Sequence, residues 1–264
     1  MAKQFLFFLL LFPNLVFLQE SIESKFNPPN GYERIFNDDY SKFLRGQSLK
    51  KDNIVKYFNG GEKYNYSIWA AVLDYDIGKK NLHQCADAVL YMRASFLHQQ
   101  KLYDKLSYKF VSGFRANYND YLDYYYKVAG NKVSLIKRNN KLEHSNETFR
   151  KWIRQIWTYS NTWSIDNYDS ISVPILNMKP GDFFIQSNPP PNVGHAVNVV
   201  DVVYNSSTNN KKFMLSQSYM PAQETHILIN PKDGTVWYDL IDFETIITPE
   251  WTFNFDELKR FKNL

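Results

Sequence analysis

The chain contains a single cysteine, Cys85, and any thiol chemistry depends on it. Cys85 falls in the first turn of a helix that we expect to begin near Asn81, with Asn81 as N-cap and Gln84 three residues on. Helix N-termini carry partial positive charge and free N–H groups, which favour the thiolate form of a nearby thiol. The alternative is that Cys85 is a small core residue, as free cysteines often are.

A thiol nucleophile needs a base within hydrogen-bond reach. Of the five histidines in the chain, His195 has the best placement, because it follows Gly194 directly and opens an apolar strand. His83 is two residues from Cys85 and would point elsewhere on the helix. His195 is therefore the candidate base, although a lone histidine in a strand is often purely structural.

An imidazole base is usually oriented by a third polar group. Gln217 ends the strand that follows the strand of His195, and it is the candidate for this role. Gln217 could equally bond to the backbone at the sheet edge. The backbone N–H of Cys85 would hold an oxyanion, and Gln84 would contact the substrate.

Other chemistries have no support in the motifs. The runs H-E-x-x-H, C-x-x-C, G-x-G-x-x-G and the Walker-type loop are absent from the sequence,. No G-x-S-x-G nucleophile elbow occurs either. The sequence therefore predicts no metal and no cofactor.

The elements that would hold these residues change character along the chain. We expect an irregular lead-in over 20–50 and a buried strand over 68–73. A helix over about 81–105 and mainly helical residues over 118–165 would follow, with 149–157 the clearest segment. The last hundred residues suggest strands at 183–185, 196–203, 213–217, 225–229 and 235–240, and a short helix over 255–261. Helices followed by an antiparallel sheet indicate an α+β fold.

The first residues have the pattern of an export signal. A short basic start precedes an apolar run, Phe5 to Leu18, which is too short to span a bilayer comfortably,. We expect a signal peptide over 1–19, with an uncleaved anchor as the alternative, and a periplasmic or extracellular protein. The sequence predicts no transmembrane segment after this leader. The oligomeric state stays open.

The net charge of +4 is scattered rather than concentrated, which argues against nucleic acid as a partner. Aromatic residues make up 17% of the chain. They could line a groove for sugar or peptide, or reflect only composition. The candidates for such a groove are Trp163, Tyr219, Trp237 and Trp251.

Four sequence blocks resemble a family of secreted bacterial proteins known as domain of unknown function 4846. The blocks are Gln84-Cys85-Ala86-Asp87-Ala88-Val89, Gly194-His195-Ala196-Val197, Gln217-Ser218-Tyr219-Met220-Pro221-Ala222-Gln223 and Thr248-Pro249-Glu250-Trp251. The resemblance covers about residues 26 to 262. It implies no particular activity.

A more distant resemblance is to papain-like cell-wall amidases and endopeptidases of the NlpC type. It rests on a cysteine at a helix start, then Lys-Pro-Gly-Asp-Phe-Phe, then Gly-His-Ala-Val and a further strand. The resemblance implies Cys85 as nucleophile, His195 as base and Gln217 as the orienting residue. Two features depart from that pattern. The 96 residues from Cys85 to Gly181 require an inserted subdomain, and the usual Asp-Cys-Ser-Gly is replaced by Gln-Cys-Ala-Asp.

Together these observations predict a single α+β domain over 20–264, with a papain-like core and a mostly helical insertion over about 106–170. The predicted activity is a cysteine hydrolase or transferase acting on an amide bond in the bacterial cell envelope. The alternative is a catalytically inactive envelope module that binds glycan or peptide in an aromatic groove.

Overall fold

A computed structural model describes residues 19–188, 193–240 and 245–263. The predicted signal peptide therefore lies, except for Gln19, outside the described residues. Within these ranges no helix is long and apolar enough to cross a membrane.

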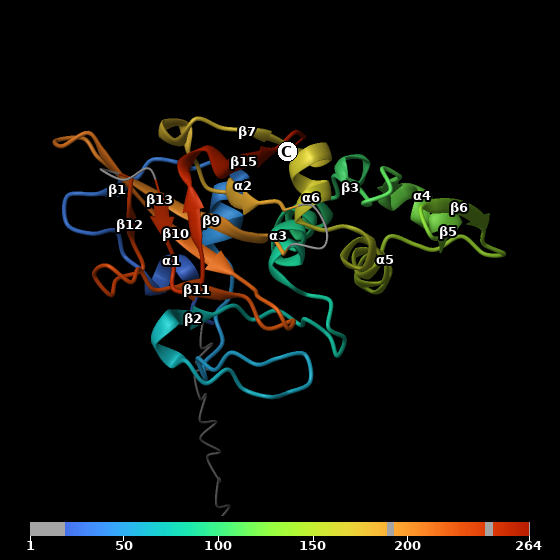
Figure 1. The fold of residues 1–264 in the computed structure, drawn as a ribbon, viewed down its shortest axis with the longest axis horizontal. Coiled ribbons are helices and arrows are strands. Elements are labelled where there is room, and N and C mark those ends of the chain that lie inside the picture. Colours follow the sequence, from blue (N-terminus) through green and yellow to red (C-terminus); the bar gives the residue numbers. More distant parts are fainter. Residues whose placement is uncertain (1–18, 189–192, 241–244, 264) are drawn as a thin grey trace, which may run out of the picture.

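One large antiparallel sheet forms the centre of the molecule (Figure 1). Its main strands follow one another in the order β2 (Trp69–Val72), β11 (His226–Leu228), β10 (Asn210–Gln217), β9 (His195–Asn205), β8 (Phe183–Gln186), β15 (Leu258–Phe261) and β7 (Ser170–Ser172). Two short strands extend it, because β1 (Glu33–Arg34) pairs with β9 and β12 (Tyr238–Asp239) pairs with β10. The mixed α/β architecture with an antiparallel sheet agrees with the sequence prediction.

Three separate hairpins stand beside the sheet. They are β3 (Ser107–Lys109) with β4 (Arg115–Asn117), β5 (Tyr124–Ala129) with β6 (Lys132–Lys137), and β13 (Thr245–Ile247) with β14 (Thr252–Asn254). The α-helices of the described chain are α1 (Ile22–Lys25), α2 (Asp39–Arg45), α3 (Cys85–Gln99), α4 (Tyr118–Asp123), α5 (Asn146–Tyr159) and α6 (Thr162–Ser164). Shorter turns of 3-10 or π type lie at 66–68, 103–105, 165–169, 175–177 and 255–257.

Each face of the sheet has its own hydrophobic cluster, because successive side chains of a strand point to opposite sides. On one face, Ala196 and Val200 of β9 belong to the cluster that contains α3 and α5. On the other face, Val197 and Val199 pack with Phe253 of β14. The helix α3 is thus enclosed between the sheet and α5, and its N-terminal turn lies near the start of β9.

Two expectations from the sequence differ from the structure. The segment 106–170 contains the hairpins β3–β4 and β5–β6 as well as α4, α5 and α6, so it is mixed rather than mostly helical. The alternating residues Tyr124–Ala129 and the turn at Gly130, with φ of 57°, explain the second hairpin,. The expected helix over 255–261 is a short 3-10 turn followed by β15, because Leu258 and Phe261 are buried and the strand pairs with β8 and β7.

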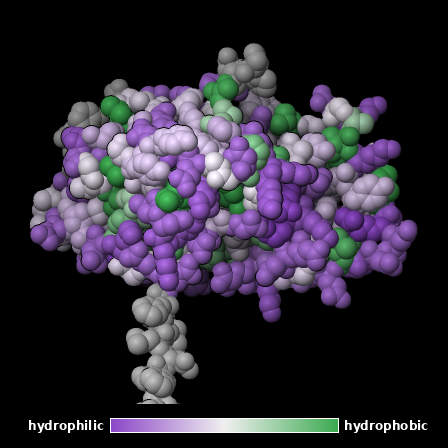
Figure 2. All heavy atoms as spheres, turned by 90° about the horizontal axis from the view of Figure 1, so that it is seen from below, coloured by the Kyte–Doolittle hydropathy of each residue, from purple (hydrophilic) through white to green (hydrophobic). Residues whose placement is uncertain are grey.

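Hydrophilic side chains predominate on the face drawn in Figure 2, and hydrophobic ones are scattered over it. That face offers no broad apolar patch. The aromatic residues instead concentrate inside, where Trp69, Trp152, Tyr108 and Tyr118 are fully buried.

Candidate active site

The start of α3 is fixed by side chains on both sides of the cap. Gln84, in an extended conformation, is the N-cap, and its N–H donates to Asp87 Oδ2 at 3.0 Å. Asn81 is not the N-cap that the sequence suggested. Its Oδ1 instead accepts from Gln84 Nε2 and from the N–H of Ala222, at 3.2 and 2.7 Å. These bonds place Cys85 as the first residue of the helix.

The thiol of Cys85 is enclosed, with 6% of the residue exposed. Burial raises its pKa to about 12, and the charge of Asp87 acts in the same direction. Hydrogen bonds from the N–H groups of Ala86 and Ala196 lower this pKa only in part. The prediction that the helix start favours the thiolate form of Cys85 is therefore wrong, because the cost of desolvating the thiolate outweighs its stabilisation by the helix terminus.

His195 opens β9 and is 1% exposed. Its Nε2 lies 2.9 Å from Gln217 Oε1. Burial lowers the pKa of the imidazole to about 4, although the bond to Gln217 acts against this shift. The ring packs against Tyr219, Trp251 and Phe253, with centroid distances of 4.7, 5.2 and 5.8 Å. The ring is thus neutral at neutral pH and held on all these sides.

The amide of Gln217 is oriented by two further groups. Its Nε2 donates to Glu250 Oε2 at 2.6 Å, and Glu250 forms an ion pair with Lys63 at 2.7 Å. Because the nitrogen of the amide faces a carboxylate, the oxygen faces His195. The oxygen can only accept, so Nε2 of His195 carries the proton and Nδ1 keeps its lone pair.

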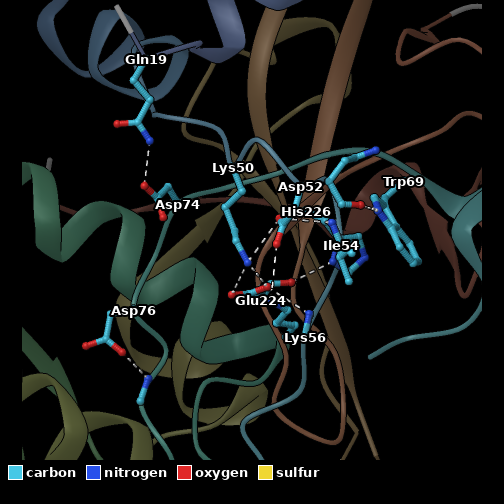
Figure 3. Close-up of polar contacts among 12 residues, drawn as sticks. Gln19, Lys50, Asp52, Ile54, Lys56, Trp69, Asp74, Asp76, Glu224 and His226 are labelled. Carbon is cyan, nitrogen blue, oxygen red and sulfur yellow. Dashed lines mark hydrogen bonds and ion pairs between the residues drawn. The ribbon is translucent and has the colours of Figure 1, made fainter. Parts of the chain in front are cut away.

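His226 supports the same assignment. Its Nδ1 donates to the backbone oxygen of Glu224 at 2.9 Å, which leaves Nε2 as an acceptor 3.4 Å from Gln217 Nε2. The Glu224 carboxylate accepts from Lys50 Nζ at 3.0 Å and from the N–H of Lys56 (Figure 3). The start of the strand that carries His226 is thereby tied to Lys50 and Lys56, and the strand itself pairs with β10.

The sulfur of Cys85 and the peptide that follows His195 are neighbours, since the N–H of Ala196 donates to the thiol. The side chain of Ala196 faces α3, whereas the ring of His195 is directed at Phe253. Among the described residues, no hydrogen bond joins the sulfur to the imidazole. The structure therefore brings His195 and Gln217 into contact and puts Cys85 beside the backbone of His195.

A cavity of about 220 Å³, which we call the thiol cavity, opens at Cys85. Its lining comprises residues 81–82, 84–87, 160–162 and 193–194 with Trp157, Asn188 and Met220. Of the expected substrate-binding residues, Gln84 lies in this lining. The aromatic candidates lie outside it. Trp163 packs on Tyr168, Tyr219 and Trp251 pack on His195, and the buried Trp237 donates to the backbone oxygen of Asn27.

Three polar residues of the site had no assigned role in the sequence analysis. Asp87 follows Cys85 by two residues, and its Oδ1 is buried without a hydrogen-bond partner among the described residues. Burial raises the pKa of Asp87 well above its ordinary value. Glu250 could have been suspected from the sequence, because it lies in the block Thr248-Pro249-Glu250-Trp251. Nothing in the sequence around Lys63 indicated a role in the site. Within the described chain, no cluster of ligating side chains could hold a metal ion.

Comparison with known proteins gives one assignment. No curated protein and no solved structure matches the chain. The model of the family called domain of unknown function (4846) matches residues 22–260, and the chain therefore belongs to that family.

Proposed function

We propose that this protein is an exported cysteine hydrolase or transferase acting on an amide bond in the bacterial cell envelope. Cys85 is the nucleophile, His195 the base and Gln217 the residue that orients the base. A papain-like core, with the cysteine at the start of a helix that packs on an antiparallel sheet, is part of this proposal. The packing of α3 on β9 supports it.

The observation that carries the proposal is the chain of bonds from Lys63 through Glu250 and Gln217 to His195. A carboxylate at one end sets which way the amide of Gln217 faces. The amide in turn keeps the proton of His195 on Nε2. An imidazole held in one tautomer, with Nδ1 able to accept, is what a thiol nucleophile requires of its base.

The chemistry begins from a neutral pair, because the pKa of Cys85 is raised to about 12 and that of His195 is lowered to about 4. The imidazole does not bond the sulfur in this structure, so the proposed step requires the ring of His195 to approach Cys85. Its Nδ1 then takes the thiol proton as the sulfur attacks the carbonyl carbon. The tetrahedral intermediate collapses when the C–N bond breaks and the imidazolium returns the proton to the leaving amine. Water or another amine then attacks the thioester and releases the thiol.

The backbone of α3 supplies charge stabilisation in this scheme. The first N–H groups of a helix have no partner within it. Those of Cys85 and Ala86 point toward the sulfur. They would donate to the oxyanion that forms when the sulfur attacks.

The test is to incubate the purified protein with cell-wall fragments and to analyse the products by mass. Cys85→Ala and His195→Ala should abolish product formation. His144→Ala is the matched control, because His144 is exposed and stacks on Tyr103. Unchanged turnover in Cys85→Ala would refute the proposal.

Glu250→Gln tests the orienting chain separately. A neutral amide at this position can donate or accept, so the amide of Gln217 is no longer forced to face one way. We expect kcat to fall with little change in KM. The pH at which turnover falls on the acid side should also shift. A purely structural loss would lower turnover without shifting this pH.

The enclosed thiol favours a second candidate, the catalytically inactive binding module. A structural cysteine would likewise be buried, as Cys85 is with 6% of the residue exposed, and would have a raised pKa. Binding of cell-wall fragments without any mass change in the products would support this module.

A further inference from the structure

A second hollow, of about 420 Å³, adjoins the thiol cavity. We call it the basic hollow, because Lys79, Lys80 and Arg154 contribute to its lining. Leu82 and Trp157 line both spaces. A ligand with its reacting bond at Cys85 could therefore extend past these two residues into the basic hollow.

The positive charge of the basic hollow is not neutralised by the residues that line it. The one carboxylate in its lining, Asp76, is already paired elsewhere. Asp76 Oδ1 accepts from the N–H of Gly78 at 2.9 Å, and Oδ2 pairs with Arg150 on α5.

Arg154 lies one turn further along α5, and its guanidinium lies against Gly78, where an added Cβ would be 3.4 Å from Nη2. In the described chain, no carboxylate pairs with the guanidinium of Arg154 or with the ammonium groups of Lys79 and Lys80.

A second, independent observation concerns Trp157. It is 5% exposed, it lines both spaces, and its indole N–H has no hydrogen-bond partner among the described residues. A buried donor of this kind is costly unless an acceptor reaches it. Because the nitrogen itself is sealed from the surface, a ligand oxygen would reach this donor only after the indole turns toward the hollow.

We propose that the basic hollow is a specificity site for a free carboxylate on the substrate, so that the protein acts on an acidic peptide. The planar guanidinium of Arg154 matches the two oxygens of a carboxylate. Lys79 and Lys80 add positive charge at the rim. This inference rests on the proposed function, because it takes the amide at Cys85 as the reacting bond.

Binding can be tested without turnover in the full chain carrying Cys85→Ala. The probes are two peptides that differ only by Glu against Gln, and the affinities are measured by calorimetry. We expect about tenfold tighter binding of the Glu peptide, the effect of one charge-assisted hydrogen bond. Arg154→Gln should remove this preference, whereas Arg154→Lys should keep part of it.

Lys151→Gln is the matched control. Lys151 lies on α5, is exposed and pairs with Glu147 at 2.6 Å, so its loss removes the same charge away from the hollow. The preference for the Glu peptide should survive in this variant. Equal affinity for the two peptides, or no binding of either, would overturn the carboxylate site and leave the thiol chemistry to its own test. Selective binding by a protein whose turnover does not need Cys85 would retain the site and remove the proposed function.

Discussion

The reactivity of the single thiol gives the sharpest test of the site, because any alkylation of the chain's cysteine reports Cys85 alone. Burial raises the pKa of this thiol from 9.0 to about 12. Each unit changes the thiolate fraction tenfold, so the native protein should hold about a thousandfold less thiolate near neutral pH than an ordinary thiol. Alkylation by iodoacetamide should be slower by a similar factor.

The assay follows the mass of the intact protein during alkylation from about pH 6 to about pH 10. The logarithm of the rate should rise by about one per pH unit, with no plateau over this range. The same protein unfolded in guanidinium is the control, and its rate should level off near the ordinary pKa of a cysteine. The slope separates the effect of pKa from slow access of the reagent, which would lower all native rates equally.

A plateau below neutral pH would refute this reasoning. It would mean that a thiolate–imidazolium pair with His195 already exists at rest. Asp87→Asn provides an independent check, because the charge of Asp87 helps to raise the thiol pKa. This variant should react faster than the native protein at every pH on the rising limb.

Three further predictions concern stability. The pKa of buried His226 is lowered from 6.5 to about 3, so its contribution is present above pH 6.5 and is lost as the pH falls toward 3. At about pH 5 the free energy of unfolding is lowered by about 2 kcal/mol for this reason. Urea unfolding of His226→Gln should not show this pH-dependent loss. In Gly194→Ala the new Cβ would lie 2.3 Å from the backbone oxygen of Gln186. This substitution should lower the free energy of unfolding, measured in urea, by about 3 kcal/mol. Asp201→Asn should cost about 3 kcal/mol, because buried Asp201 binds Arg34 at 2.7 Å,.

Each of these results has a control in the chain. Gly130→Ala meets nothing within 4 Å and should cost about 1 kcal/mol, from its left-handed backbone alone,. Glu147→Gln breaks an exposed pair and should change the unfolding free energy by less than about 0.5 kcal/mol,. Equal losses in Gly194→Ala and Gly130→Ala, or in Asp201→Asn and Glu147→Gln, would contradict the packing and burial arguments. An unchanged pH dependence in His226→Gln would contradict the assigned pKa.

The sheet and the helix of Cys85 were predictable because local patterns carry them. The apolar run at the start of β9 and the strand that ends at Gln217 appear in the structure near the expected positions. The contact between His195 and Gln217 follows from the pairing of these neighbouring strands.

Features that depend on distant partners were not predictable from local patterns. The strand Leu258–Phe261 forms because β7 and β8 flank it, and its own sequence suggested a helix. The lead-in over 20–50 contains α2 and β1, which Asp201 holds through Arg34 and Arg45. The high pKa of Cys85 is likewise a property of the packing around it, since the position at a helix start alone indicates the opposite shift.

The hairpin of β5 and β6 extends away from the sheet (Figure 1). Its turn at Gly130 has no other atoms within 4 Å of an added Cβ. A short peptide epitope or a dye attachment site inserted there would meet little resistance from the rest of the chain. Such a handle would allow the protein to be captured or tracked on cells while both ends of the chain and the mouth of the thiol cavity stay untouched.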